Sequence, residues 1–162
     1  MATGKTTLGK ALADAMGCHF ADTDDLIAKK HQKSIPEIFE LYGEEFFRQE
    51  ETEMIKQLMS AENQVVATGG GAAAKEENMA CLLENAHVIC LTASLETIME
   101  RTGQDTSRPL LQSENRLNRI MILLNVREKH YAKADYHICT DVWDLEGFIK
   151  KIKEFINMDK RR

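Results

Sequence analysis

Short apolar segments alternate along the chain with longer segments in which apolar residues recur every three or four positions, and this alternation restricts the fold more than any other feature. The short segments are predicted strands at residues 18–21, 64–67, 87–92 and 136–140. Predicted helices occupy residues 5–16, 24–30, 35–42, 44–60, 76–84, 95–102, 114–133 and 145–157. We therefore expect an α/β fold, a three-layer α/β/α sandwich with a mainly parallel sheet. At 162 residues the chain fits a single domain, residues 1–162.

Composition argues against several classes of partner. The formal net charge is −5, so we expect no general attraction to nucleic acid or to a membrane surface. The longest apolar runs are too short to cross a bilayer. We therefore expect a cytoplasmic protein, and a monomer.

The first predicted helix begins with Gly4-Lys5-Thr6. This triplet is the second half of the phosphate-loop pattern G-x-x-x-x-G-K-[ST], whose first glycine would lie before Met1. Amide groups at a helix amino end bind anions, so the position suits a nucleotide phosphate. Lys5 could neutralise β- and γ-phosphate oxygens, and the Thr6 hydroxyl could bind Mg²⁺. An ordinary helix start is the competing interpretation.

Asp22 and Asp24 follow a predicted strand and lie two positions apart. In an extended segment this spacing directs both carboxylates to the same side, at the sheet edge where ligands bind. One could hold Mg²⁺ through water while the other accepts a proton from a substrate hydroxyl. Alternatively, these aspartates cap the following helix.

Glycines and arginines supply further candidates for a binding site. The run Gly69-Gly70-Gly71 follows a buried predicted strand and would allow a ligand to approach the backbone closely, although a flexible turn is equally possible. Arg48 and Glu51 lie three apart on one predicted helix, where they can form an ion pair. Arg127 lies four residues before Tyr131 on another. Arginine matches a carboxylate with two hydrogen bonds, but most helical arginines are simply solvated.

The polar segment 103–113, which contains Pro109, is predicted to be a mobile surface loop. Arg101 and Arg108 lie beside and within it. Such a lid could close over phosphates and stabilise the charge of a transferring group.

The chain resembles shikimate kinases in six segments that occur in the family's order and approximate spacing. They read ATGKTTLGKALA, FADTDDLI, IPEIFELYGEEFFRQEE, VVATGGG, SRPLL and REKHY. The resemblance covers essentially the whole chain. It implies a P-loop fold like that of nucleoside monophosphate kinases, with about residues 22–60 as the substrate-binding region. It also implies ATP- and Mg²⁺-dependent phosphorylation of the 3-hydroxyl of shikimate, a step of aromatic amino-acid biosynthesis.

The resemblance also implies roles for individual residues. The nucleotide would be bound by Gly4, Lys5, Thr6, Thr7, Arg101 and Arg108, with Arg101 near adenine. The metal would be bound by Thr6 and Asp22. Shikimate would be bound by Asp24, Arg48, Gly70, Gly71 and Arg127, with both arginines on its carboxylate. The catalytic residues would be Lys5, Asp24 and Arg108, with Asp24 receiving the proton of the reacting hydroxyl.

Two features depart from the family pattern. Residues 139–143 match the family's adenine loop poorly, so no adenine contact is predicted there. The family also has a buried strand that ends in the first phosphate-loop glycine, and we expect the natural product to start upstream, with Met1 an internal methionine. Without that central strand two neighbouring strands would lose ladder partners, and the protein should be unstable or inactive.

Two other functions remain open from the sequence. A different small-metabolite kinase, such as a gluconate kinase, would share Gly4-Lys5-Thr6 but would not need paired carboxylate-binding arginines. A non-catalytic nucleotide-binding protein with an incomplete phosphate loop is the second alternative, because similarity of fold does not guarantee a working site.

Overall fold

The computed structural model describes residues 2–102 and 116–159, and its elements alternate as the sequence predicts. In chain order they are α1 (Lys5–Met16), β1 (His19–Asp22), α2 (Thr23–His31), α3 (Ile35–Met59), β2 (Gln64–Ala67), the 3-10 turn η1 (Ala72–Ala74), α4 (Glu76–Asn85), β3 (Ile89–Thr92), α5 (Leu95–Arg101), α6 (Arg116–Tyr131), β4 (Tyr136–Cys139) and α7 (Leu145–Met158). The four predicted strands are all present. The predicted α/β class is confirmed.

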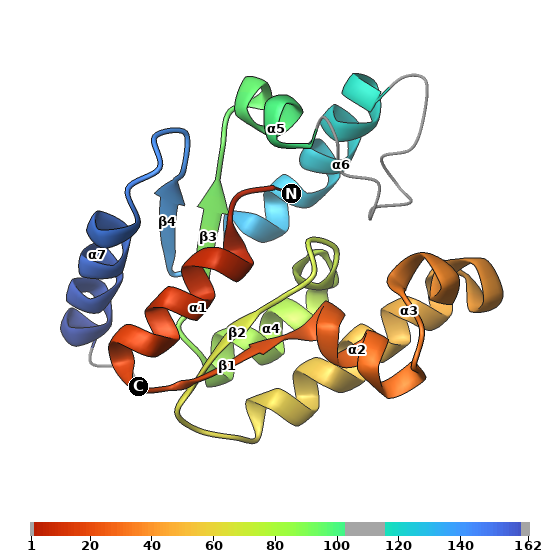
Figure 1. Ribbon diagram of the computed structural model, residues 1–162, viewed down its shortest axis with the longest axis horizontal. Helices are drawn as coiled ribbons and strands as arrows, with labels where there is room; N and C mark the ends of the chain where they lie inside the picture. The colour runs from red at the N-terminus through yellow and green to blue at the C-terminus, as the bar shows by residue number, and fades with distance from the viewer. Residues whose placement is uncertain (1, 103–115, 160–162) are drawn as a thin grey trace.

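The strands form two separate parallel pairs within the described residues. β1 pairs with β2, with Phe20 opposite Val65, and β3 pairs with β4, with Leu91 opposite Ile138. β2 and β3 do not pair with each other, and a cavity of about 830 Å³ lies between them. Figure 1 shows the two pairs side by side, with α7 near the β3–β4 pair and α2 near the β1–β2 pair, while α1 contacts β1, β2 and α7.

Two of the hydrophobic clusters in the described residues support the helices that carry the site. The α1–α7 core consists of Leu8, Leu12, Ile138, Phe148 and Ile152. The α2–α3 core consists of Ile27, Ile38, Phe47 and Met54. Burying such side chains contributes about 1.5–3 kcal/mol each. Val65 of β2 also packs against the α1–α7 core, so this core joins both strand pairs.

Helix α3 consists of two helical segments that meet at Gly43, where the sequence predicts the end of one helix and the start of the next. Gly43 has φ 81° and ψ 172°, which are not helical values, so the backbone kinks there. Only glycine adopts such a positive φ readily, which explains why the sequence indicated a stop. The segment after the kink carries Arg48 and Glu51.

The start of α3 is fixed by a capping box. The Glu37 N–H donates to Ser34 Oγ, while the Ser34 N–H donates to the Glu37 carboxylate at 2.7 Å. The hydrogen bonds from the Ser34 side chain and backbone lower the pKa of Glu37. Two amides at the helix start are thereby satisfied.

Among residues 2–102 and 116–159, no helix combines the length and the apolar character that a bilayer crossing requires.

Replacing Ser34 by alanine should lower the free energy of unfolding by about 1 kcal/mol, because an amide of the first turn loses its acceptor. Ser60→Ala is the matched control at the other end of α3, where the hydroxyl donates to the Gln57 carbonyl. The control should change stability by less than about 0.5 kcal/mol. Urea unfolding followed by circular dichroism measures both, and equal losses would contradict the capping role.

Candidate functional site

The glycine run after β2 lies at the centre of a polar site. The Gly69 N–H donates to Thr23 Oγ1 at 3.0 Å, which ties the loop to the start of α2. The Tyr131 hydroxyl donates to the Gly70 carbonyl, which ties it to α6. The loop is therefore held between two helices, and these hydrogen bonds argue against the flexible-turn interpretation.

Each of the three glycines leaves room for a charged side chain. A Cβ on Gly69 would lie 2.6 Å from Asp24 Oδ1 and would also collide with Glu51 Oε1. One on Gly71 would lie 2.6 Å from Cζ of Arg48, and one on Gly70 would lie 3.2 Å from Nη1 of Arg127. The absence of side chains in the loop thus allows two carboxylates and two guanidinium groups to converge on its backbone. These four side chains, with the loop 69–71, are called the glycine-loop cluster below.

Arg48 is held by carboxylates on its own helix. It pairs with Glu51 and lies 3.0 Å from Glu44 Oε1. Burial opposes the charge of Arg48, but the two carboxylates outweigh burial and raise its pKa. Because the guanidinium is fixed before any ligand arrives, less side-chain entropy is lost on binding.

Glu51 is the most deeply buried charged group of the glycine-loop cluster, with 1% of its surface exposed. Burial raises the pKa of its carboxyl, Arg48 opposes this rise, and the nearby Asp24 carboxylate adds to it. Arg127, 7% exposed, also acts on Glu51. The sequence indicated an Arg48–Glu51 pair from their spacing, but the contact of Glu51 with the glycine loop was missed.

The extended backbone expected from Asp22 to Asp24 is not present, because a helix begins between them. Helix α2 begins at Thr23, which places only Asp22 on the strand. Asp22 caps the helix by accepting the Asp24 N–H at 3.0 Å, and it also accepts the Thr6 hydroxyl at 2.9 Å. Asp24 lies in the first turn and faces Gly69. The helix-cap and functional interpretations of Asp22 are therefore compatible.

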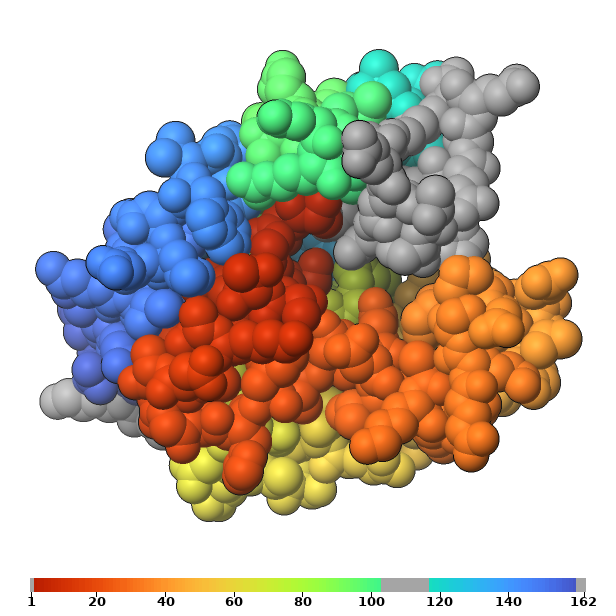
Figure 2. All heavy atoms as spheres, viewed as in Figure 1, coloured from red at the N-terminus to blue at the C-terminus, as the bar shows by residue number. Residues whose placement is uncertain are grey.

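The amino end of α1 faces the same region. Gly4 has φ 80°, and no side chain caps the first-turn amides. Thr6 and Thr7 are exposed there, and Lys5 lines the cavity between β2 and β3. Figure 2 shows the surface hollowed between the start of α1 and the α2–α3 region. The geometry brings Thr6 and Asp22 together, as the sequence predicted for a metal site.

Arg101 lies close to the start of α1, where its predicted nucleotide role would place it. It donates to the Thr140 carbonyl at 2.6 Å and to the Ala2 carbonyl at 3.4 Å. Its Cζ lies 5.8 Å from the Trp143 ring, and a Cβ on Gly4 would collide with that ring. Sequence reasoning assigned Trp143 no role; the available signal was a lone tryptophan in a polar loop.

Some predicted features fall outside this description. Arg108 and the predicted lid at 103–113 lie outside the described residues, so their roles stay predictions. Within the described ranges, no three His, Cys, Asp or Glu side chains form a metal-binding group.

Comparisons with known proteins show the family of this chain. The family model described as shikimate kinase matches residues 1–157. The curated shikimate kinase of Geobacter sulfurreducens is 45% identical over 96% of this chain and 86% of its own length. The curated shikimate kinase of Thermodesulfovibrio yellowstonii is 45% identical over 96% of this chain and 90% of its own length. A solved shikimate kinase from Acinetobacter baumannii, in complex with shikimate, has a TM-score of 0.94 and 37% identity, and the match covers 100% of this chain and 91% of that one.

The raised pKa of Glu51 predicts how stability depends on pH. The native state holds the Glu51 proton more tightly than the unfolded chain does. Protonated Glu51 therefore contributes to the free energy of unfolding at low pH, and this contribution is lost as pH rises through the native pKa. The Glu51→Gln variant should not show this loss of stability, because glutamine does not titrate. The free energy of unfolding of the variant, minus that of the unsubstituted protein, should become more positive as pH rises from 4.5 to 7.

The matched control is Glu53→Gln, which removes an exposed carboxylate from the same helix. Urea unfolding at several pH values gives both differences. If the two variants show the same slope with pH, Glu51 does not hold its proton as proposed.

Proposed function

Because the chain belongs to the shikimate kinase family, we propose that it transfers the γ-phosphoryl group of ATP to the 3-hydroxyl of shikimate and releases ADP. The observation that supports this most is the glycine-loop cluster, which holds two guanidinium groups beside a carboxylate. A small hydroxylated acid needs cations for its carboxylate and an acceptor for its reacting proton.

Arg48 and Arg127 would bind the substrate carboxylate, and the backbone of Gly70 and Gly71 would contact the rest of the molecule. Both glycines lie against an arginine, so a ligand gripped by the guanidinium groups would meet the loop backbone. Bidentate arginine–carboxylate pairs fix orientation as well as affinity, which matters in a reaction that depends on positioning.

Asp24 would accept the proton as the substrate oxygen forms its bond to the γ-phosphorus and the bond to ADP breaks. Its position beside Gly69 and Glu51, in the glycine-loop cluster, supports this role. Lys5 and the first-turn amides of α1, with Thr7 and Arg101, would hold the nucleotide at the opposite side. Arg108 would approach with the 103–113 lid.

Thr6 and Asp22 suit Mg²⁺, which prefers oxygen ligands and is commonly held by one or two carboxylates together with phosphates. When bound, the ion neutralises charge on the phosphates. The cytoplasmic location and the monomeric state stay predictions.

An ADP-release assay with ATP and Mg²⁺ should show turnover with shikimate and none with gluconate. The paired arginines favour a carboxylate-bearing ring, and gluconate lacks the ring on which the hydroxyls are fixed. Turnover of gluconate alone would replace the proposed substrate. ATP binding without turnover of either acid would favour the non-catalytic alternative.

Asp24→Asn should reduce kcat by about 100-fold or more, since the proton acceptor is lost while the substrate and nucleotide contacts remain. ATP affinity, measured by calorimetry, should stay within about twofold. Asp25→Asn is the matched control, because Asp25 is the exposed neighbour on the same helix. Near-normal kcat in the Asp24 variant would remove it from its proposed role.

A further inference from the structure

The glycine run after β2 forms a β-turn, residues 69–72, whose two ends are anchored by helices. The Gly69 carbonyl accepts the Ala72 N–H at 3.1 Å, which closes the turn around the two glycines at its centre. The Gly69 N–H donates to Thr23 Oγ1, and the Asn78 side chain donates to the Ala72 carbonyl at 3.0 Å. The ends of this glycine turn are therefore fixed by α2 and α4, but these anchors do not fix its central peptide.

The central peptide of the glycine turn, between Gly70 and Gly71, has two orientations open to it. Gly71 has φ −93° and ψ −22°, close to the values of about −90° and 0° at the third residue of a type I turn. In a type II turn the same peptide is turned over, and the third residue needs a φ of about +80°, which glycine adopts readily. Both turn types keep the hydrogen bond between the ends. A contact from outside the turn must therefore select type I.

Tyr131 on α6 makes such a contact with the central peptide. Its hydroxyl donates to the Gly70 carbonyl, which is the acceptor of that peptide. In the type II form this carbonyl would point to the other face of the turn, and the hydrogen bond would be lost. Because a partly buried carbonyl without a donor is unfavourable, the Tyr131 hydroxyl favours the type I form.

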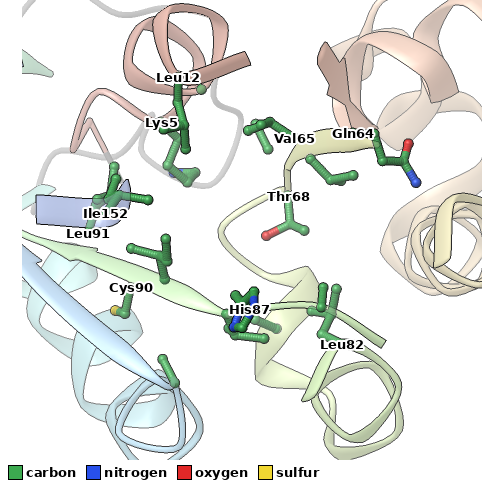
Figure 3. Close-up of a pocket in the computed structure, with 18 of the residues that line it drawn as sticks. Lys5, Leu12, Gln64, Val65, Thr68, Leu82, His87, Cys90, Leu91 and Ile152 are labelled. Carbon is green, nitrogen blue, oxygen red and sulfur yellow. The ribbon is translucent and has the colours of Figure 1, made fainter. Parts of the chain in front are cut away.

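The orientation of the Gly70 carbonyl decides where the next amide points. The C=O and N–H of a trans peptide point in opposite directions, so the Gly71 N–H is directed away from Tyr131. Thr68, Gly70 and Tyr131 line the cavity between β2 and β3, and Figure 3 shows Thr68 on its wall. Gly71 lies instead against the Arg48 guanidinium. Within the described part of the chain the Gly71 N–H has no acceptor, so it can donate to a ligand held by Arg48.

Tyr131 lies on the same helix as a proposed substrate ligand. Arg127 precedes it by four residues, so both side chains project from one face of α6. Arg127 Nη1 lies 3.2 Å from the position that a Cβ on Gly70 would take. An ion pair between Glu76 of α4 and Lys133 holds the chain just after α6 in place. Helix α6 therefore presents a guanidinium group and a tyrosine hydroxyl to the same glycine turn.

We propose that Tyr131 is a positioning residue that selects the type I form of the glycine turn and thereby directs the Gly71 N–H toward the substrate. This inference rests on the proposed kinase function, since the acceptor for that amide would be an oxygen atom of the hydroxylated acid. In the type II form the Gly70 carbonyl would take the place of the amide and would repel such an oxygen. Without the Tyr131 hydroxyl, only the fraction of molecules with a type I turn is ready to bind.

The Tyr131→Phe variant removes the hydroxyl and keeps the ring. We expect KM for shikimate to rise at least about threefold, because apparent affinity falls with the fraction of molecules in the binding-competent form. The value of kcat should stay within about twofold, since bound substrate restores the type I turn. Tyr136→Phe is the matched control, because it removes the same hydroxyl from β4, where the ring stacks on Phe155. The control should leave both constants unchanged.

The turn itself can be observed in ligand-free protein labelled with carbon and nitrogen isotopes at glycine. The NMR shifts of the Gly71 amide and Cα report the sign of its φ. They should move toward the positive-φ form in the Tyr131 variant and not in the Tyr136 variant. Added shikimate should return them toward the values of the unsubstituted protein.

Two results would overturn the proposal. A rise in KM with unchanged Gly71 shifts would show that Tyr131 contacts the substrate itself and does not select the turn. Equal KM values for the Tyr131 and Tyr136 variants would reduce the hydroxyl to a structural role. The Gly71 shifts need no turnover, so a protein that fails to phosphorylate shikimate would reject the proposed function separately. In that case the Gly71 shifts alone decide whether Tyr131 selects the turn.

Discussion

The absence of side chains at Gly69, Gly70 and Gly71 is the constraint on which the site depends. Any Cβ at Gly69 or Gly71 would occupy space that Asp24, Glu51 and Arg48 now fill. The glycine-loop cluster therefore requires the loop as much as the charged groups. Because the loop is tied to α2 and α6, the charges on those helices keep fixed positions relative to one another. This is preorganisation of the kind that binding and phosphoryl transfer require.

The two cores contribute differently to that site. The α2–α3 core supports the glycine-loop cluster, and the α1–α7 core supports the helix whose amino end would face phosphate. The Thr6–Asp22 hydrogen bond joins the start of α1 to the end of β1, the strand that leads into α2. This hydrogen bond therefore fixes the start of α1 relative to α2, which carries Asp24.

Sequence reasoning predicted the features that follow from local pattern and failed where three-dimensional context decides. The alternation of short apolar segments with helical patterns predicted the strands and the fold class. The three-residue spacing of Arg48 and Glu51 predicted their ion pair. The backbone at Asp24 was not predicted, because the spacing suggested an extended segment through Thr23, where the helix begins. The position of Trp143 against Gly4 joins residues far apart in the chain, which no local pattern reports.

The electrostatics of the site explain how an acidic protein can hold an anionic substrate. Within the glycine-loop cluster, two guanidinium groups face the carboxylates of Glu51 and Asp24, so no large excess of either charge is buried. Leaving Arg48 without its carboxylates would leave a partly buried cation unpaired, which is unfavourable. Glu51 therefore permits Arg48 to lie half-buried beside Gly71 before a ligand arrives. A substrate carboxylate would then meet cations that are already oriented, and the net charge of −5 of the whole chain would have little influence at that distance.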